Sequence, residues 1–166
     1  MARSVVLIGP MGAGKTTFGK KLAKSLGMPF VDTDKLIASK HGPITKLFSV
    51  KGEEHFRELE QEALAQSLEI AGIVATGGGV VLRPENQKSL ASHFVVFLDT
   101  DQESVIGKIN LDRRPLLKEN PDEWGRIYKE RLPIYNRLAD VRIFTGSRPI
   151  REIMKELEEV VNGKFL

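Results

Sequence analysis

Residues 4–16 read SVVLIGPMGAGKT and give the strongest indication of the fold. The run 4–8 is almost wholly apolar, as a buried strand of a parallel sheet would be. The residues that follow, 9–16, fit the pattern G-x-x-x-x-G-K-[ST]. Apolar side chains then recur at helical spacing as far as residue 26. Because the pattern is specific when a strand precedes it and a helix follows it, we predict a phosphate-binding loop here.

The residue types in this loop are suited to binding phosphate and magnesium. Glycines let backbone N–H groups curl around phosphate oxygens, and the helix N-terminus adds a partial positive charge. The Lys15 ammonium can reach the β- and γ-phosphates, and the Thr16 hydroxyl can bind Mg²⁺. The loop thus predicts a nucleoside triphosphate with magnesium and leaves the acceptor open. The residues expected at the nucleotide are Gly12, Ala13, Gly14, Lys15, Thr16 and Thr17.

The rest of the chain alternates short apolar runs with helical patterns. Further strands are predicted at 30–31, 73–75, 94–98 and 141–144. Helices are predicted at 53–70 and near the C-terminus, the latter with Ser147 as its cap and Pro149 in its first turn. This alternation predicts an α/β protein with a parallel sheet covered by helices on both faces. The stretch 109–124 lacks periodicity, and such a long loop is usually functional or mobile.

Composition excludes several classes of protein. The 166 residues, 41% hydrophobic and 28% charged, are typical of one globular domain. The chain has no cysteine, which excludes disulfides and thiolate metal sites and fits a cytoplasmic protein. A net charge of +3 is too small to indicate nucleic acid, and no apolar run approaches the roughly 18 residues that span a bilayer. We expect a cytoplasmic monomer with small-molecule partners, no nucleic acid and no membrane.

Two carboxylates stand at the end of the second predicted strand, at the sheet edge where α/β proteins bind ligands. If the strand runs through Asp32 and Asp34, its alternation points both side chains the same way. One would then serve a metal and the other a substrate hydroxyl. The alternative is that one of them only caps the next helix.

Three glycines, Gly77, Gly78 and Gly79, follow the third predicted strand. They permit close approach of the backbone to a ligand, and the alternative is a flexible strand exit. Asp99 ends the fourth predicted strand as a Walker B aspartate would. The residues after it indicate a helix start, so we interpret Asp99 as structural.

Three arginines are candidates for binding an anion. Arg57 lies among acidic residues on a predicted helix, so an ion pair on a solvated face is the alternative to a ligand contact. The same two readings hold for Arg131. Arg114 stands in the aperiodic stretch, where a phosphate-capping arginine and a plain surface arginine are both open. Trp124 and Tyr128 are interpreted as packing residues, and the alternative is a platform on which a base stacks.

Five short motifs together resemble those of the shikimate kinase family. They are VDTD at 31–34, GEEHFRELE at 52–60, TGGG at 76–79, RRPLL at 113–117 and RLPIY at 131–135. The resemblance implies one domain over 1–166 with the nucleoside monophosphate kinase type of fold, a five-stranded parallel sheet flanked by helices. It implies a substrate-binding helical segment at about 33–62 and a mobile lid at about 109–124. The implied reaction transfers the γ-phosphoryl group of ATP to the 3-hydroxyl of shikimate.

The resemblance also implies roles for residues at the reacting groups. Lys15 matches the position that contacts phosphate, while Thr16 and Asp32 match the positions at Mg²⁺. Asp34 matches the carboxylate that holds the reacting hydroxyl and is the candidate base. Arg114 matches the lid arginine at the γ-phosphate.

The carboxylate of shikimate is implied to bind Arg57 and Arg131, whose planar guanidinium groups suit it. The residues implied to touch the rest of the substrate are Gly77, Gly78 and Gly79. One position departs from the family, which often has an arginine near adenine shortly before the lid arginine. This chain has Gly107 there, beside Lys108, and Arg148 lies where an adenine loop is expected.

Three alternatives share part of this pattern. A gluconate kinase would share the phosphate loop and the size, but it is not expected to combine TGGG with RLPIY. A nucleoside monophosphate kinase would need base-recognition residues and several lid arginines. A nucleotide-binding switch without enzymatic function would hydrolyse the nucleotide slowly and use no small-molecule acceptor.

Overall fold

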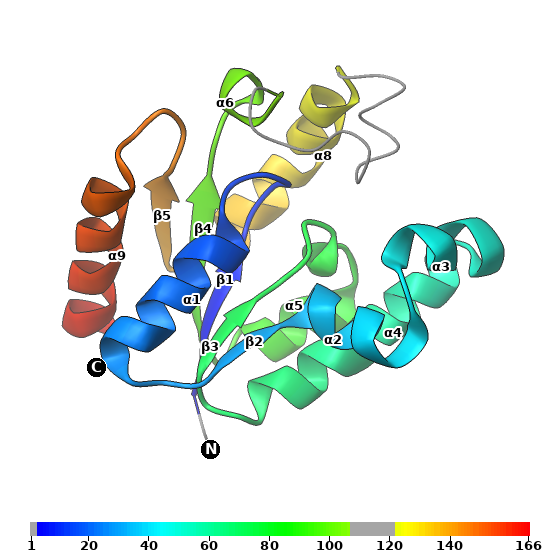
Figure 1. Ribbon diagram of the computed structural model, residues 1–166, viewed down its shortest axis with the longest axis horizontal. Coiled ribbons are helices and arrows are strands. Elements are labelled where there is room, and N and C mark those ends of the chain that lie inside the picture. The colour runs from blue at the N-terminus through cyan, green and yellow to red at the C-terminus, as the bar shows by residue number, and fades with distance from the viewer. Residues whose placement is uncertain (1–2, 107–121) are drawn as a thin grey trace.

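The computed structural model describes residues 3–106 and 122–166. Within them the chain forms a five-stranded parallel sheet in the order β2-β3-β1-β4-β5 (Figure 1). The strands are β1 (Val5–Ile8), β2 (Phe30–Asp32), β3 (Ile73–Ala75), β4 (Phe94–Asp99) and β5 (Val141–Phe144). The predicted five-stranded parallel sheet is therefore confirmed.

Helices cover both faces of this sheet. One face carries α1 (Lys15–Leu26) and α9 (Ile150–Lys164), and the other carries α4 (Glu53–Leu68), α5 (Pro84–Leu90) and α8 (Glu123–Leu138). The shorter elements are α2 (Thr33–His41), α3 (Ile44–Lys51), α6 (Gln102–Ile106) and the 3-10 turn η1 (Val80–Leu82). Among the helices in the described parts of the chain, none combines the length and the apolar character that a membrane span requires.

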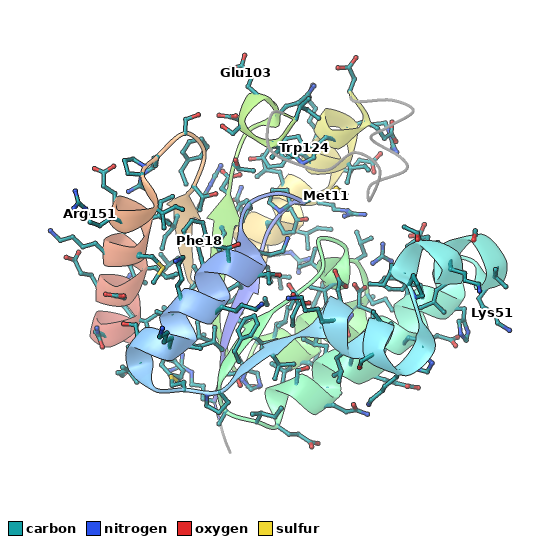
Figure 2. All side chains as sticks on the ribbon, in the orientation of Figure 1. Met11, Phe18, Lys51, Glu103, Trp124 and Arg151 are labelled. Carbon is teal, nitrogen blue, oxygen red and sulfur yellow. The ribbon has the colours of Figure 1, made fainter. Side chains whose placement is uncertain are left out.

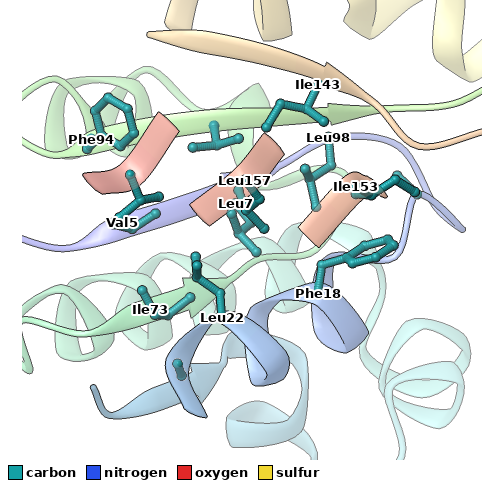
Figure 3. Packing of buried hydrophobic residues seen from close by; sticks show 14 residues of the cluster. Val5, Leu7, Phe18, Leu22, Ile73, Phe94, Leu98, Ile143, Ile153 and Leu157 are labelled. Atoms are coloured by element: carbon teal, nitrogen blue, oxygen red, sulfur yellow. The ribbon is translucent and has the colours of Figure 1, made fainter. Parts of the chain in front are cut away.

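The core follows from the alternation of side chains along the central strands. Val5 and Leu7 of β1 point to one face, where they pack with Leu22 of α1 and Leu157 of α9 (Figure 3). Val6 and Ile8 point to the other face and pack against α4, α5 and α8. Because β1 is fully buried on both faces, its sequence is a continuous apolar run.

A third apolar cluster joins α2, α3 and α4 at one side of the sheet. Its buried residues are Ile37, Leu47, Phe56 and Ala63. In Figure 1 this group stands at the right of the view, across the sheet from α9. It spans most of the predicted helical segment 33–62 and forms one wall of the cleft described below.

Several predicted element boundaries are wrong, and one of them is the end of the helix predicted at 53–70, which lies at Leu68. The second strand ends at Asp32, and Asp34 lies in the first turn of α2, so the two carboxylates do not alternate along a strand. The last helix begins at Ile150 with Pro149 as its N-cap, and Ser147 lies outside it with a left-handed φ of 51°. The predicted aperiodic stretch 109–124 ends earlier than expected, because Glu123 and Trp124 already belong to α8.

Candidate active site

All five strands point their carboxyl ends to one edge of the sheet, and the candidate residues gather there. The phosphate loop follows β1. Gly9 has a φ of 144°, and a Cβ atom on it would lie 2.1 Å from the carbonyl oxygen of Leu98, so only glycine fits. Lys15 opens α1 and is buried, and its Nζ donates to the carbonyl oxygens of Gly9 and Pro10. These bonds hold the ammonium group over the loop.

Thr16 and Asp32 meet beside this loop. The Thr16 hydroxyl donates to Asp32 Oδ2 over 2.5 Å, and Asp32 Oδ1 accepts from the backbone N–H of Lys35 over 3.1 Å. Asp32 therefore caps α2, as the alternative reading held, and also faces the threonine of the phosphate loop. In the described parts of the chain no three acidic or histidine side chains cluster as a metal site. A hydroxyl and a carboxylate oxygen nevertheless fit Mg²⁺, which binds few protein ligands and keeps several waters.

Arg57 does not lie on a solvated helix face. Its side chain is 10% exposed, and its guanidinium carbon is 5.3 Å from the ring centre of Phe56. It does form helical ion pairs, with Nη1 at 2.8 Å from Glu60 Oε1 and Nε at 3.4 Å from Glu53 Oε2. The predicted ion pairs of Arg57 thus exist, but its guanidinium group is buried at the cleft and does not lie on a solvated face.

Glu60 is a residue of this site that the sequence reasoning did not single out. Its side chain is 1% exposed, and Oε2 has no hydrogen-bond partner among the described residues. Burial raises the pKa of this carboxyl group, and the charge of Arg57 opposes that rise. A glutamate three residues after an arginine, on the apolar side of the helix, was the available signal.

The three glycines after β3 lie against these charged groups. A Cβ atom on Gly79 would lie 2.4 Å from Arg57 Nη1, and one on Gly77 would lie 2.8 Å from Asp34 Oδ1. On Gly78 it would lie 3.4 Å from Arg131 Nη1. The glycines therefore let two guanidinium groups and a carboxylate approach the backbone, which a mere strand exit would not require.

One cleft of about 760 Å³ brings these groups together. Arg148 also lines it, and its guanidinium donates to the carbonyl oxygen of Phe144 and pairs with Glu156. Arg114, Gly107 and Lys108, with most of the predicted lid, lie outside the described residues. The predicted site residues that line the cleft are Gly12, Ala13, Gly14, Lys15, Thr16, Thr17, Asp32, Asp34, Arg57, Gly77, Gly78, Gly79, Arg131 and Arg148.

Asp99 has a structural environment, as predicted. Its side chain is 4% exposed, pairs with Arg142 over 2.5 Å and accepts from the Tyr128 hydroxyl over 2.7 Å. Tyr128 in turn stacks on the buried ring of Trp124, with ring centres 5.0 Å apart. Both aromatic rings therefore contribute to packing, although both also line the cleft.

Known proteins show the same sequence pattern and the same fold. The family model described as shikimate kinase matches residues 11–162. The shikimate kinase of Pseudomonas syringae pv. tomato is 44% identical over 163 residues, covering 93% of this chain and 94% of the relative. That of Symbiobacterium thermophilum is 41% identical over 167 residues, covering 94% of each. A solved structure of shikimate kinase from Acinetobacter baumannii in complex with shikimate matches with a TM-score of 0.90 at 34% identity, covering 100% of this chain and 97% of its own.

Proposed function

The chain belongs to the shikimate kinase family, and we propose that it transfers the γ-phosphoryl group of ATP to the 3-hydroxyl of shikimate. The products are shikimate 3-phosphate and ADP. The main observation behind this proposal is that one cleft contains two groups of residues suited to binding anions. A phosphate loop with its lysine forms the first, and two arginines beside a glycine turn form the second.

The nucleotide binds at the phosphate loop. The backbone N–H groups of the loop and the N-terminus of α1 surround the phosphates. Lys15 neutralises charge on the phosphoryl group while it is transferred. Phosphoryl transfer depends mainly on positioning and charge neutralisation, so a lysine that the loop carbonyls already hold in place is well suited to it. Arg148, at the rim of the cleft, is proposed to contact the nucleotide.

Thr16 and Asp32 are the residues that would hold Mg²⁺ in this cleft, since they already bring two oxygen atoms together. When bound, Mg²⁺ neutralises charge on the β- and γ-phosphates. Asp32 also caps the start of α2, where it accepts a hydrogen bond from the N–H of Lys35.

Shikimate binds on the other wall. Arg57 and Arg131 present charged donors beside Gly79 and Gly78, and a carboxylate is the group that such forks bind well. Asp34 reaches the same turn at Gly77 and is proposed to orient the 3-hydroxyl and accept its proton. The acceptor would thus be held at its acid end by arginines and at its reacting end by an aspartate.

The proposed role of Arg114 at the γ-phosphate rests on its sequence motif and on the family. It lies outside the described residues, as does most of the lid proposed for 109–124. We also propose that the chain is one domain and acts as a monomer in the cytoplasm without a nucleic-acid or membrane partner. Sedimentation of the purified protein tests whether it is a monomer.

A coupled assay of ADP release tests the proposed function. With ATP and Mg²⁺ present, shikimate should stimulate ADP release strongly, whereas gluconate and nucleoside monophosphates should not. If gluconate or a nucleoside monophosphate stimulates ADP release and shikimate does not, the acceptor is a different compound. Slow ADP release that no acceptor changes would instead identify a nucleotide-binding switch.

A further inference from the structure

Helix α8 directs two aromatic hydrogen-bond donors at two different loops of the cleft. Near its start, Trp124 Nε1–H donates to the carbonyl oxygen of Met11 in the phosphate loop over 2.8 Å. Near its end, the Tyr135 hydroxyl donates to the carbonyl oxygen of Gly78 in the glycine turn over 2.6 Å. Both side chains are buried, at 4% and 1% exposed. Figure 2 shows Trp124 beside Met11, at the end of α8 that faces the phosphate loop.

A carbonyl group that is held in place fixes the N–H group that follows it. The peptide bonds of the described chain are trans, so C=O and N–H of one peptide point in opposite directions. Because the Met11 carbonyl is turned toward Trp124, the N–H of Gly12 is turned away from that ring. In the same way, the N–H of Gly79 is turned away from Tyr135. Both N–H groups belong to loops that line the cleft.

Each of the two donors packs against another aromatic ring. Trp124 stacks almost parallel on Tyr128, at 10° between the rings, and the Tyr128 hydroxyl donates to the buried Asp99 carboxylate. Burial raises the pKa of Tyr135 to about 12, so its hydroxyl stays protonated and remains a donor at neutral pH. Its ring packs against Phe97 of β4, with ring centres 5.0 Å apart. Both donors thus pack against a neighbouring aromatic ring while they bond to their carbonyl groups.

We propose that α8 presets both loops, with Trp124 as a positioning residue for the nucleotide phosphates and Tyr135 as a positioning residue for shikimate. The identity of the two ligands rests on the proposed function. Because α8 also carries Arg131, which lies beside Gly78, the helix fixes the distance between the two halves of the cleft. Two loops that are far apart in sequence are thus aligned by one rigid element.

Two conservative variants separate the two halves of this proposal. Trp124→Phe keeps an aromatic ring for the stack and removes the N–H donor, and Tyr135→Phe removes only the hydroxyl. Titration calorimetry with ADP and with shikimate measures each ligand without turnover. Losing one hydrogen bond that orders the loop should weaken ADP binding to Trp124→Phe about three- to tenfold and leave shikimate binding unchanged. Tyr135→Phe should show the reverse pattern.

Ser67→Ala is the matched control, because it removes a buried hydroxyl that donates to the carbonyl oxygen of Ala63 within α4 and contacts neither loop. It should lower thermal stability and leave both affinities unchanged. If Trp124→Phe and Tyr135→Phe weaken both ligands equally, or neither ligand, the proposal is overturned and the two residues serve only packing. If the wild type binds both ligands with the crossed pattern in the variants but transfers no phosphoryl group, the proposed reaction fails while the positioning roles stand.

The wild-type protein offers a second test that needs no variant. The chain has a single tryptophan, so its fluorescence reports on Trp124 alone. Saturation with ADP should shift this emission, since the acceptor of the indole N–H belongs to the loop that binds phosphate, whereas shikimate alone should change it much less. Emission that ADP leaves unchanged would overturn the role of Trp124.

Discussion

Replacing Arg57 by glutamine should destabilise the fold and weaken shikimate binding, and the two effects can be separated. The guanidinium of Arg57 and the carboxylate of Glu60 are 2.8 Å apart and both are buried. Breaking a buried ion pair from one side costs about 3–5 kcal/mol, because the remaining charge loses its partner. That is a large part of the roughly 5–15 kcal/mol that keeps a domain folded.

The destabilisation should depend on pH in a known direction. Burial raises the pKa of Glu60, and Arg57 opposes that rise, so the pKa should be higher still in Arg57→Gln. A carboxyl group whose pKa is higher in the folded state binds its proton more tightly when folded. The folded state therefore loses stability as pH rises from the unfolded-state pKa to the folded-state pKa. Urea unfolding should show the variant losing stability relative to wild type between acidic and neutral pH.

The double variant Arg57→Gln/Glu60→Gln isolates the effect on binding, since it leaves no unpaired buried charge at this position. Losing a charged hydrogen bond to the substrate should cost about 1.5–3 kcal/mol, which raises the dissociation constant of shikimate about 10- to 150-fold. ADP affinity should stay near that of wild type. Calorimetry with shikimate and with its primary amide tests the contact itself, because the variant should discriminate less against the amide. A double variant with wild-type affinity and wild-type discrimination would refute the assignment of Arg57.

Three further variants test the reacting end of the cleft. Lys15→Met should abolish phosphoryl transfer while the fold survives, because the ammonium neutralises charge in transfer; near-wild-type turnover in a folded variant would remove it from the mechanism. Asp34→Asn should lower kcat severely with smaller effects on both binding constants, since an amide orients the hydroxyl but accepts no proton. An equal loss of shikimate affinity and rate would make Asp34 a binding residue. Arg114→Ala should lower kcat far more than it raises either KM, and an unchanged kcat would contradict the role that its sequence motif implies.

The sheet could be predicted well because its sequence signal is local. Buried parallel strands are continuous apolar runs, and β3 and β5 begin and end where those runs do. The first helix begins at Lys15 of the phosphate loop and ends before Gly27, whose left-handed φ of 66° stops it. In these elements the local pattern and the observed bounds agree.

The acceptor side was harder to predict because its chemistry depends on contacts between distant residues. The sequence positions of Asp32 and Asp34 fit either a continued strand or the start of a helix. The hydrogen bond that Asp32 accepts from the N–H of Lys35 shows that a helix starts here. An arginine among glutamates is usual on a solvated helix, and it is the approach of Gly79 that places Arg57 in the cleft. The position of Glu60 on the apolar side of its helix indicates burial, but its contact with the glycine turn depends on the tertiary fold.

The position of the transferred phosphoryl group on the acceptor is the direct test of the proposed reaction. The protein is incubated with shikimate, Mg²⁺ and ATP labelled in the γ-phosphoryl group, and the acceptor is isolated and examined by mass spectrometry and phosphorus NMR. We predict that the label appears as a phosphate ester on the 3-hydroxyl of shikimate, in amounts equal to the ADP formed. Label found only as inorganic phosphate, or on another hydroxyl of the acceptor, would contradict the proposed reaction.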